Sequence, residues 1–166
     1  VQVRAKFPEA QLLLTGKGEY REAIIQRAKT LGLRPGRELV LSGYWDGDLR
    51  DILCQLDVFV LQSAGSEGTA RALLEAMAFG LPAVVSQTDG MDDIVEDGTS
   101  GIVVPPSDPE ALSTKIISLL QDRNRAKLIG ERARERATFE FDQWVQAKRV
   151  ETAYQILLGS VRETKV

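Results

Sequence analysis

The chain has 166 residues, of which 43% are hydrophobic and 27% charged, so its length suits one globular domain with a sizeable core. A net charge of -3 argues against a nucleic-acid-binding protein, because phosphate contacts need a concentrated basic face and the sequence has none. No apolar run reaches the ~20 residues that span a bilayer, and the start VQVRAKFPEA lacks a signal-peptide pattern. We expect a soluble, cytoplasmic protein, for which peripheral contact with the inner face of a membrane stays open.

The chain begins with Val1 rather than Met, and its first residues resemble the end of a helix. We therefore expect residues 1–166 to form a single domain of a longer protein, truncated at its N-terminus. Cys54 is the one cysteine and lies in the apolar segment DILCQLDVFVL. This setting predicts a buried, reduced thiol without a catalytic role.

Five short apolar runs alternate with helical patterns. The runs are rich in Val and Leu and several end in Gly or Ser, as in strands buried on both faces of a parallel sheet. They read AQLLLTG, ELVLSG, VFVLQS, PAVVSQ and GIVVP, with helices predicted between them at 20–31, 47–55, 69–79 and 92–95. Such units need right-handed crossovers, so we predict an α/β fold with a doubly wound, Rossmann-like parallel sheet of about five strands.

Helices alone are predicted after the last apolar run. Asp108 is the expected N-cap of the first, with Pro109 at its first position. Further helices are expected at 124–137 and at 143–158, and Asp142 is the expected cap of the last one.

Ligands of a doubly wound sheet bind beyond the carboxyl ends of its strands, where helix N-termini present free amides. The loop SAGSEGT follows the third apolar run, and its glycines, Gly65 and Gly68, allow a tight turn into the next helix. We predict that the amides of Thr69, Ala70 and Arg71 are unpaired first-turn donors. This arrangement favours a bound anion.

Two acids in and after this loop need an explanation. Glu67 precedes the predicted helix, and its favourable interaction with the helix dipole, ~0.3 to 1 kcal/mol, explains it as well as a ligand would. Glu75 lies among the apolar residues LLEAMAF, where a pair with Arg71 would contribute only ~0.2 to 0.5 kcal/mol. Burying a carboxylate costs several times more. We interpret Glu75 as facing a polar cleft, where it accepts hydrogen bonds from a vicinal diol.

The two acids, with seven residues between them in SEGTARALLEAMAFGLPAVVS, resemble the motif of the retaining GT-B glycosyltransferases. This large group includes glycogen synthase-like and lipopolysaccharide sugar transferases. The resemblance continues through LLLTGKGE, LSGYWDGDLRDILCQLDVFVLQS, TDGMDDIVEDGTSGIVVPPSDPEAL and the terminal FDQWV and VETAYQILL. It covers nearly the whole chain in the order that the family has.

The resemblance implies the C-terminal, nucleotide-sugar-binding domain of a two-domain hexosyltransferase of polysaccharide biosynthesis. Glu75 would bind the ribose hydroxyls, and Glu67, the candidate catalytic residue, would hold the donor sugar near its 3 and 4 hydroxyls. Other implied donor-binding residues are the loop Gly16, Lys17 and Gly18 beside the nucleotide, the backbone of Tyr44 and Trp45 at the base edge, and Gly68, Thr69, Ala70 and Arg71 at the pyrophosphate or sugar. For Lys17 the competing explanation is that it only forms part of a tight turn. For Trp45 the competing explanation is that it is a surface aromatic residue next to a turn.

The chain departs from the family pattern in several places. Thr69-Ala70 stands where Phe-Gly is usual, and Asp93 replaces a Glu, which suggests a role for Asp93 in capping or loop stability. The first strand of the family's domain, with its Arg and Lys, and the acceptor-binding N-terminal domain would precede Val1. The resemblance therefore implies an incomplete enzyme that is inactive alone, and whose sheet must close a gap locally or borrow a strand by dimerisation.

The implied reaction is transfer, with retention of anomeric configuration, from a nucleotide-diphosphate sugar to a glycan or lipid-linked acceptor. No cofactor and no metal are implied, and we interpret Asp46 and Asp48 as turn and cap residues. A nucleotide-sugar 2-epimerase-like domain and a non-catalytic nucleotide-sugar-binding module stay open as alternatives. The sequence does not name the base, the sugar, the acceptor or the oligomeric state.

Overall fold

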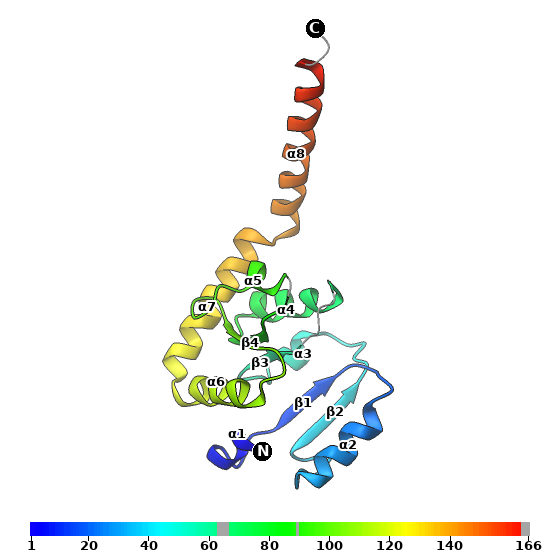
Figure 1. Cartoon of the computed structure of the whole chain (residues 1–166), viewed down its shortest axis with the longest axis vertical. Coiled ribbons are helices and arrows are strands. Elements are labelled where there is room, and N and C mark those ends of the chain that lie inside the picture. The colour runs from blue at the N-terminus through cyan, green and yellow to red at the C-terminus, as the bar shows by residue number, and fades with distance from the viewer. Residues whose placement is uncertain (63–66, 89, 164–166) are drawn as a thin grey trace.

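The computed structural model describes residues 1–62, 67–88 and 90–163, without the side chains of residues 67–69, 92 and 159–163 (Figure 1). Each of the five predicted runs contains a strand. The strands are β1 (Leu12–Thr15), β2 (Leu39–Gly43), β3 (Phe59–Leu61), β4 (Ala83–Ser86) and β5 (Ile102–Val104). The prediction of an α/β fold with parallel strands is confirmed.

The strands form two parallel sheets rather than one continuous sheet. β1 pairs with β2, and separately β3 pairs with β4 and β4 with β5. No strand pairing among the described residues joins β1 to β3, so each of these two strands keeps one edge without a strand partner. No described segment pairs with these two edges, so the gap that the family resemblance implies in the sheet is not closed among the described residues.

The helices follow the predicted order, with shifts of a few residues at their ends. Their bounds are α1 (Gln2–Lys6), α2 (Arg21–Thr30), α3 (Arg50–Leu53), α4 (Glu67–Phe79), α5 (Met91–Ile94), α6 (Pro109–Gln121), α7 (Arg123–Glu140) and α8 (Gln143–Glu163). Helix α1 matches the helical end expected at the start of the chain. The C-terminal helices α6, α7 and α8 confirm the expected all-helical end.

Aspartate caps determine where the C-terminal helices begin. The Asp108 carboxylate accepts hydrogen bonds from the amides of Glu110 and Ala111, as predicted. Asp142 accepts from the amide of Trp144, which confirms the second predicted cap. Asp122 was not predicted: it ends α6 and caps α7 by accepting from the Arg125 amide.

Strand β4 carries the core of the three-stranded sheet. All four of its residues are buried, and alternate side chains enter different clusters. Ala83 and Val85 pack with α4, α5 and the later part of α7, whereas Val84 packs with β5, α6 and the earlier part of α7. Helices thus cover both faces of this sheet, as a doubly wound fold requires.

Helix α7 approaches the end of α4 very closely. Gly80 follows α4 with a φ of +86°, a left-handed conformation that ends the helix. A Cβ atom added to Gly130 on α7 would lie 2.1 Å from the carbonyl oxygen of Gly80. Glycine at position 130 therefore allows the two backbones to touch and brings α7 against the core.

The region around Cys54 differs from the prediction. The thiol is exposed rather than buried, and it contacts the Asp51 carbonyl oxygen at 3.5 Å. Helix α3 has four residues, and the Arg50 amide at its start donates a hydrogen bond to the Asp48 carboxylate. Ile52 and Leu53 occupy the buried side of this short helix, which leaves Cys54 on the solvent side.

Helix α8 extends away from the rest of the molecule (Figure 1). Its exposed large side chains include Trp144, Val150, Tyr154 and Leu158, and the last three recur every fourth residue along one face. No helix in the described ranges is both long enough and apolar enough to cross a membrane.

A buried carboxylate holds the start of β2. Glu38 is 6% exposed at its side chain and accepts hydrogen bonds from the Arg34 amide at 2.9 Å and the Arg34 Nε at 3.0 Å. Arg4 of α1 and Arg37 lie 3.8 and 3.7 Å from the same carboxylate. Hydrogen bonding from the Arg34 side chain lowers the pKa of Glu38 from 4.5 to about 2. Glu38 thereby ties α1 and the segment before β2 together.

We expect the free energy of unfolding to decrease as the pH falls from about 4.5 toward 2. The folded pKa of Glu38 is below its unfolded value, so the unfolded chain binds a proton in this range that the folded chain excludes. The stabilisation is complete above pH 4.5 and is lost as the pH approaches 2. Urea unfolding midpoints measured across this range would test the dependence.

The matched variants are Glu38→Gln and Glu9→Gln, because Glu9 is an exposed acid. Glu38→Gln should be less stable at neutral pH and should lose stability less steeply on acidification. Glu9→Gln should follow the wild-type curve. Parallel curves for wild type and Glu38→Gln would contradict this role of Glu38.

Candidate functional site

The loops that leave β1 and β2 meet at the carboxyl end of the two-stranded sheet. The pairing register shifts after Leu14, so that Thr15 lies opposite Gly43. The Gly16 amide then donates to the Gly43 carbonyl oxygen at 2.7 Å. Gly16 has a φ of +115° and Gly43 a φ of +71°, values that side chains with a Cβ rarely adopt. These two glycines turn both loops away from the sheet.

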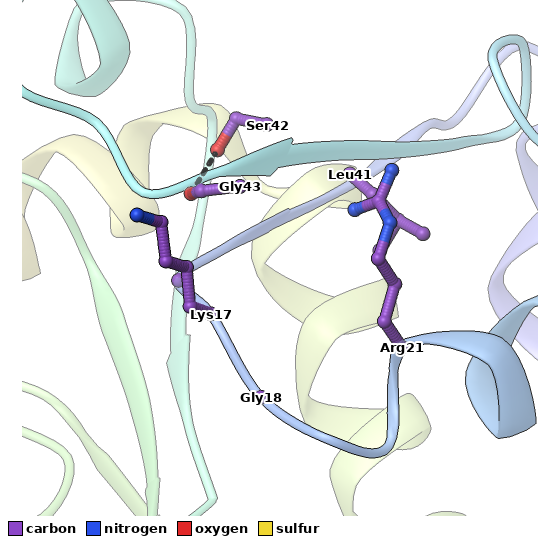
Figure 2. A pocket seen from close by; sticks show the side chains of 7 residues that line it. Lys17, Gly18, Arg21, Leu41, Ser42 and Gly43 are labelled. Carbon is purple, nitrogen blue, oxygen red and sulfur yellow. Dashed lines mark hydrogen bonds between the residues drawn. The ribbon is translucent and has the colours of Figure 1, made fainter.

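A cavity of about 300 Å³ lies between these loops and the start of α2 (Figure 2). Figure 2 shows Lys17 pointing toward Gly43, and Arg21 reaching from the first position of α2 toward Leu41 of β2. The wall is formed by Gly16, Lys17, Gly18, Arg21, Leu41, Ser42 and Gly43. The predicted glycine loop thus lines a cavity together with residues of β2.

Lys17 and Tyr44 are brought together although 26 residues separate them in the sequence. The Lys17 Nζ atom lies 5.1 Å from the centroid of the Tyr44 ring, within the range of a cation–π contact. The parallel pairing of β1 with β2 causes this contact, because both residues follow the ends of paired strands. Lys17 therefore contacts the loop after β2 in addition to forming its own turn.

Trp45 folds back over its own turn. Its indole Nε1 donates to the Asp48 carbonyl oxygen at 3.0 Å, and its ring lies close to Gly47. This side chain belongs to the turn, as the surface-aromatic explanation proposed. The expected contact of its backbone with a base stays a prediction.

Asp48 lies one residue before Leu49, the N-cap of α3, and binds the turn that leads into this helix. Its carboxylate accepts from the Arg50 amide at 2.9 Å and from the Arg50 Nε at 2.9 Å. Hydrogen bonding from the Arg50 side chain lowers the pKa of Asp48 from 3.8 to about 2. Both oxygens therefore serve the turn that leads into α3.

Helix α4 begins at Glu67, two residues earlier than predicted. The unpaired first-turn amides are consequently those at positions 67–69, and Ala70 and Arg71 lie one step further into the helix. The side chains of Glu67 and Thr69, and with them the predicted catalytic contact, lie outside the part of the chain that the structure describes, as does the preceding loop with Gly65. Gly68 lies in the first turn of α4.

Glu75 lies on α4 and is partly exposed, with 35% of its side-chain surface accessible. The Arg71 Nε donates to the Glu75 Oε1 at 2.8 Å, so the pair considered from the sequence is formed. The Arg71 side chain is 86% exposed. Glu75 is thus neither sealed in the core nor without a partner, because α4 turns Leu73, Ala76 and Met77 into the core instead. The polar cleft and the diol contact expected for Glu75 stay predictions.

The predicted donor-binding residues fall into two groups. Gly16, Lys17 and Gly18 line the cavity, with Tyr44 at Lys17. Glu75 and Arg71 form the other group, and no hydrogen bond or ion pair among the described residues links it to the first. Sequence reasoning missed Arg21, although its position three residues after Gly18 could have indicated it.

The backbone of Asp93 is held by a residue of α7. Arg136 of α7 donates to the carbonyl oxygens of Asp93 and Ile94, each at 2.9 Å, and so fixes the end of α5. The backbone at Asp93 thus has a structural contact, in line with a role in loop stability. Among the described residues, no three His, Cys, Asp or Glu side chains gather where they could hold a metal ion.

Comparison with known proteins gives a consistent result. The family model of "Glycosyl transferases group 1" matches residues 1–136. A sulfoquinovosyl transferase of Arabidopsis thaliana is 36% identical over 137 residues, which are 80% of this chain and 26% of the relative. A lipopolysaccharide core biosynthesis glycosyltransferase of Rhizobium meliloti is 30% identical over 160 residues, 96% of this chain and 45% of the relative.

A solved structure has the same fold as this chain. The crystal structure of the Anabaena protein HepE in complex with UDP-glucose superposes with a TM-score of 0.79 at 25% identity, and covers 89% of this chain and 42% of HepE. The chain spans less than half the length of each of these three proteins. The chain belongs to the group 1 glycosyltransferases and has the fold of a GT-B C-terminal domain.

Proposed function

We propose that this domain binds the nucleotide-sugar donor of a retaining hexosyltransferase that acts on a glycan or lipid-linked acceptor. The observation that carries the proposal is the Glu75 carboxylate, which lies on the helix that follows β3 and is partly open to solvent. In the proposed complex it accepts hydrogen bonds from the two ribose hydroxyls. The UDP-glucose bound by HepE, a relative with the same fold, supports a sugar nucleotide as the ligand.

The pair between Arg71 and Glu75 is compatible with this role. Arg71 is highly exposed, and exposed ion pairs contribute little to stability because solvent screens them. Arg71 can therefore exchange its contact with Glu75 for one with a phosphate of the ligand. Glu75 would then keep a charge-assisted hydrogen bond to the ribose.

The proposed reaction passes through an oxocarbenium-like transition state while negative charge develops on the leaving diphosphate. Amides at the start of α4 would stabilise this charge, and Glu67 would orient the donor sugar. We propose that no separate cofactor or metal is needed, because amides and cationic side chains can supply that stabilisation. The acceptor would be bound by another part of the longer protein, in the cytoplasm and, for a lipid-linked acceptor, at the inner face of the membrane.

The first test replaces Glu75 by Gln, which keeps the shape of the side chain and removes its charge. We expect roughly a tenfold to hundredfold loss of affinity for the sugar nucleotide, because hydrogen bonds to charged groups are the stronger class. Calorimetric titration with UDP-, GDP- and ADP-sugars would measure the change.

Glu131→Gln is the matched control for Glu75→Gln. Glu131 is also the acidic member of a helical pair four residues apart, with Lys127 at 3.7 Å on α7. If Glu75 served only its ion pair, the two variants would behave alike, with small changes in stability and unchanged ligand affinity. Equal affinities for wild type and Glu75→Gln would contradict the proposed ribose contact.

We further propose that residues 1–166 alone do not transfer sugar. The chain spans less than half the length of the relatives it matches, and an acceptor site is expected in the remainder. Incubation of the isolated chain with sugar nucleotides and acceptor glycans, followed by product analysis, should yield neither transferred sugar nor an isomerised donor. Transfer catalysed by the isolated chain would overturn the proposal, and an isomerised donor would indicate an epimerase.

Copies of the isolated chain are proposed to dimerise. The open edges of β1 and β3 and the apolar face of α8 support this proposal. Sedimentation velocity over a range of concentrations should give a dimer, and a Tyr154→Lys, Leu158→Lys variant would separate the two surfaces. A dimer that persists in this variant uses the sheet edges, whereas a monomer for the wild type at every concentration would refute dimerisation.

A further inference from the structure

We propose that Arg136 of α7 is a positioning residue for the donor site, which it supports through α5, and that Glu140 links this support to helix α8. The inference rests on the proposed function, since it presumes that Glu75 of α4 binds a sugar nucleotide. Arg136 and Glu140 are assigned no contact with the ligand, and they act through the helices that carry the site.

Arg136 supports the end of α5, a helix of only four residues. The carbonyl oxygens in the last turn of a helix have no partners within it, so they need donors from outside. The Arg136 Nε donates to the Ile94 carbonyl oxygen and the Arg136 Nη2 to that of Asp93, each at 2.9 Å. One side chain of α7 thus satisfies two carbonyl oxygens of α5 and fixes this short helix from outside.

Arg136 is itself held in place by its surroundings. Its side chain is 22% exposed, and its Nη1 donates to the Glu140 Oε1 at 2.9 Å. The centre of the guanidinium lies 5.8 Å from the centroid of the Phe141 ring. A planar guanidinium can serve three acceptors at fixed angles, whereas a lysine ammonium is a single point at the end of a flexible stem. The contacts of Arg136 therefore favour one orientation of its side chain.

Helix α5 packs against α4, the helix that carries Glu75. Met91 of α5 and Leu73 of α4 belong to the same buried cluster. Ile94, whose carbonyl oxygen Arg136 holds, is part of this cluster as well. In a close-packed core, a shift of one helix is transmitted to the helices that it touches. A displacement of α5 should therefore move the part of α4 on which Glu75 lies.

Glu140 connects Arg136 with α8. The Glu140 carboxylate accepts from Arg136, while the Glu140 carbonyl oxygen accepts from two side chains of α8. These are Gln146 and Arg149, the latter at 3.1 Å. Figure 1 shows α5 beside the end of α7 from which α8 extends away. A change in the direction of α8 therefore acts on the residue that holds Arg136, and by linkage the effect is reciprocal.

Calorimetric titration of the chain with UDP-glucose and GDP-mannose tests the positioning role. Arg136→Gln removes the charge and the planar fork, and should weaken donor binding about twofold to thirtyfold, the range for residues that act without touching a ligand. Arg136→Lys keeps the charge but reaches fewer acceptors, so its loss should be smaller. Arg132→Gln, at an exposed position of α7, is the matched control and should bind like the wild type.

Hydrogen exchange of the free and the ligand-bound chain separates positioning from stability. In Arg136→Gln and Glu140→Gln, the amides of 91–95 and those at the start of α8 should exchange faster together, while those of β1 and β2 stay unchanged. In the wild type, the bound sugar nucleotide should slow exchange in α5 and at the start of α8. In Arg136→Gln this effect should no longer reach α8. Glu135→Gln, at an exposed acid of α7, is the control for Glu140→Gln.

The outcomes separate this inference from the proposed function. A lower unfolding temperature with unchanged donor affinity in Arg136→Gln would make Arg136 a structural residue only and overturn the inference. Independent exchange of α5 and the start of α8 would overturn the link through Glu140. Both results leave the proposed function in place if Glu75→Gln still weakens binding. Failure of both sugar nucleotides to bind the wild-type chain overturns the function and the inference together.

Thermal unfolding of each variant shows the temperature below which the titrations are made. If Arg136→Gln does not fold, the milder variants Arg136→Lys and Glu140→Gln carry the same test with smaller expected losses of affinity.

Discussion

The parallel pairing of short strands is the constraint on which the rest of this structure depends. Each strand has three to five residues, and the parallel pairings of β1 with β2 and of β3, β4 and β5 place their carboxyl ends at the same edge of each sheet. The return segments carry helices because parallel strands need crossovers. Loops that are distant in the sequence, such as those of Lys17 and Tyr44, meet at this edge.

The strands differ in how well they are buried. Strand β4 lies between two partners and is completely buried, and β5 is mostly buried, whereas no residue of β1 or β3 is fully buried. Leu12 at the start of β1 is 47% exposed although its sequence is typical of an interior strand. The Val and Leu content of β1 and β3 therefore matches a more enclosed position than the described residues provide.

Two glutamates illustrate how the surroundings of an acid decide its role. Glu38 is buried among Arg4, Arg34 and Arg37, and its contacts hold elements of the fold together. Glu75 is a third exposed, and its described partner is a solvent-exposed arginine. In the sequence, Glu75 stands out because its neighbours are apolar. Glu38, in the loop before β2, has no such pattern around it and was not singled out. Burial and the count of charged partners, which only coordinates provide, separate the structural acid from the candidate ligand-binding one.

The sequence by itself determined the strand and helix order, the caps at Asp108 and Asp142, and the family. These follow from local patterns, because strand periodicity, capping side chains and motif spacing act over a few residues. The tertiary structure decided the gap between β1 and β3, the exposure of Cys54, the pairing of Arg71 with Glu75 and the cavity that adds Arg21 to Lys17. Each of these depends on which segments meet in space, and contacts between distant segments are set by packing rather than by the local pattern.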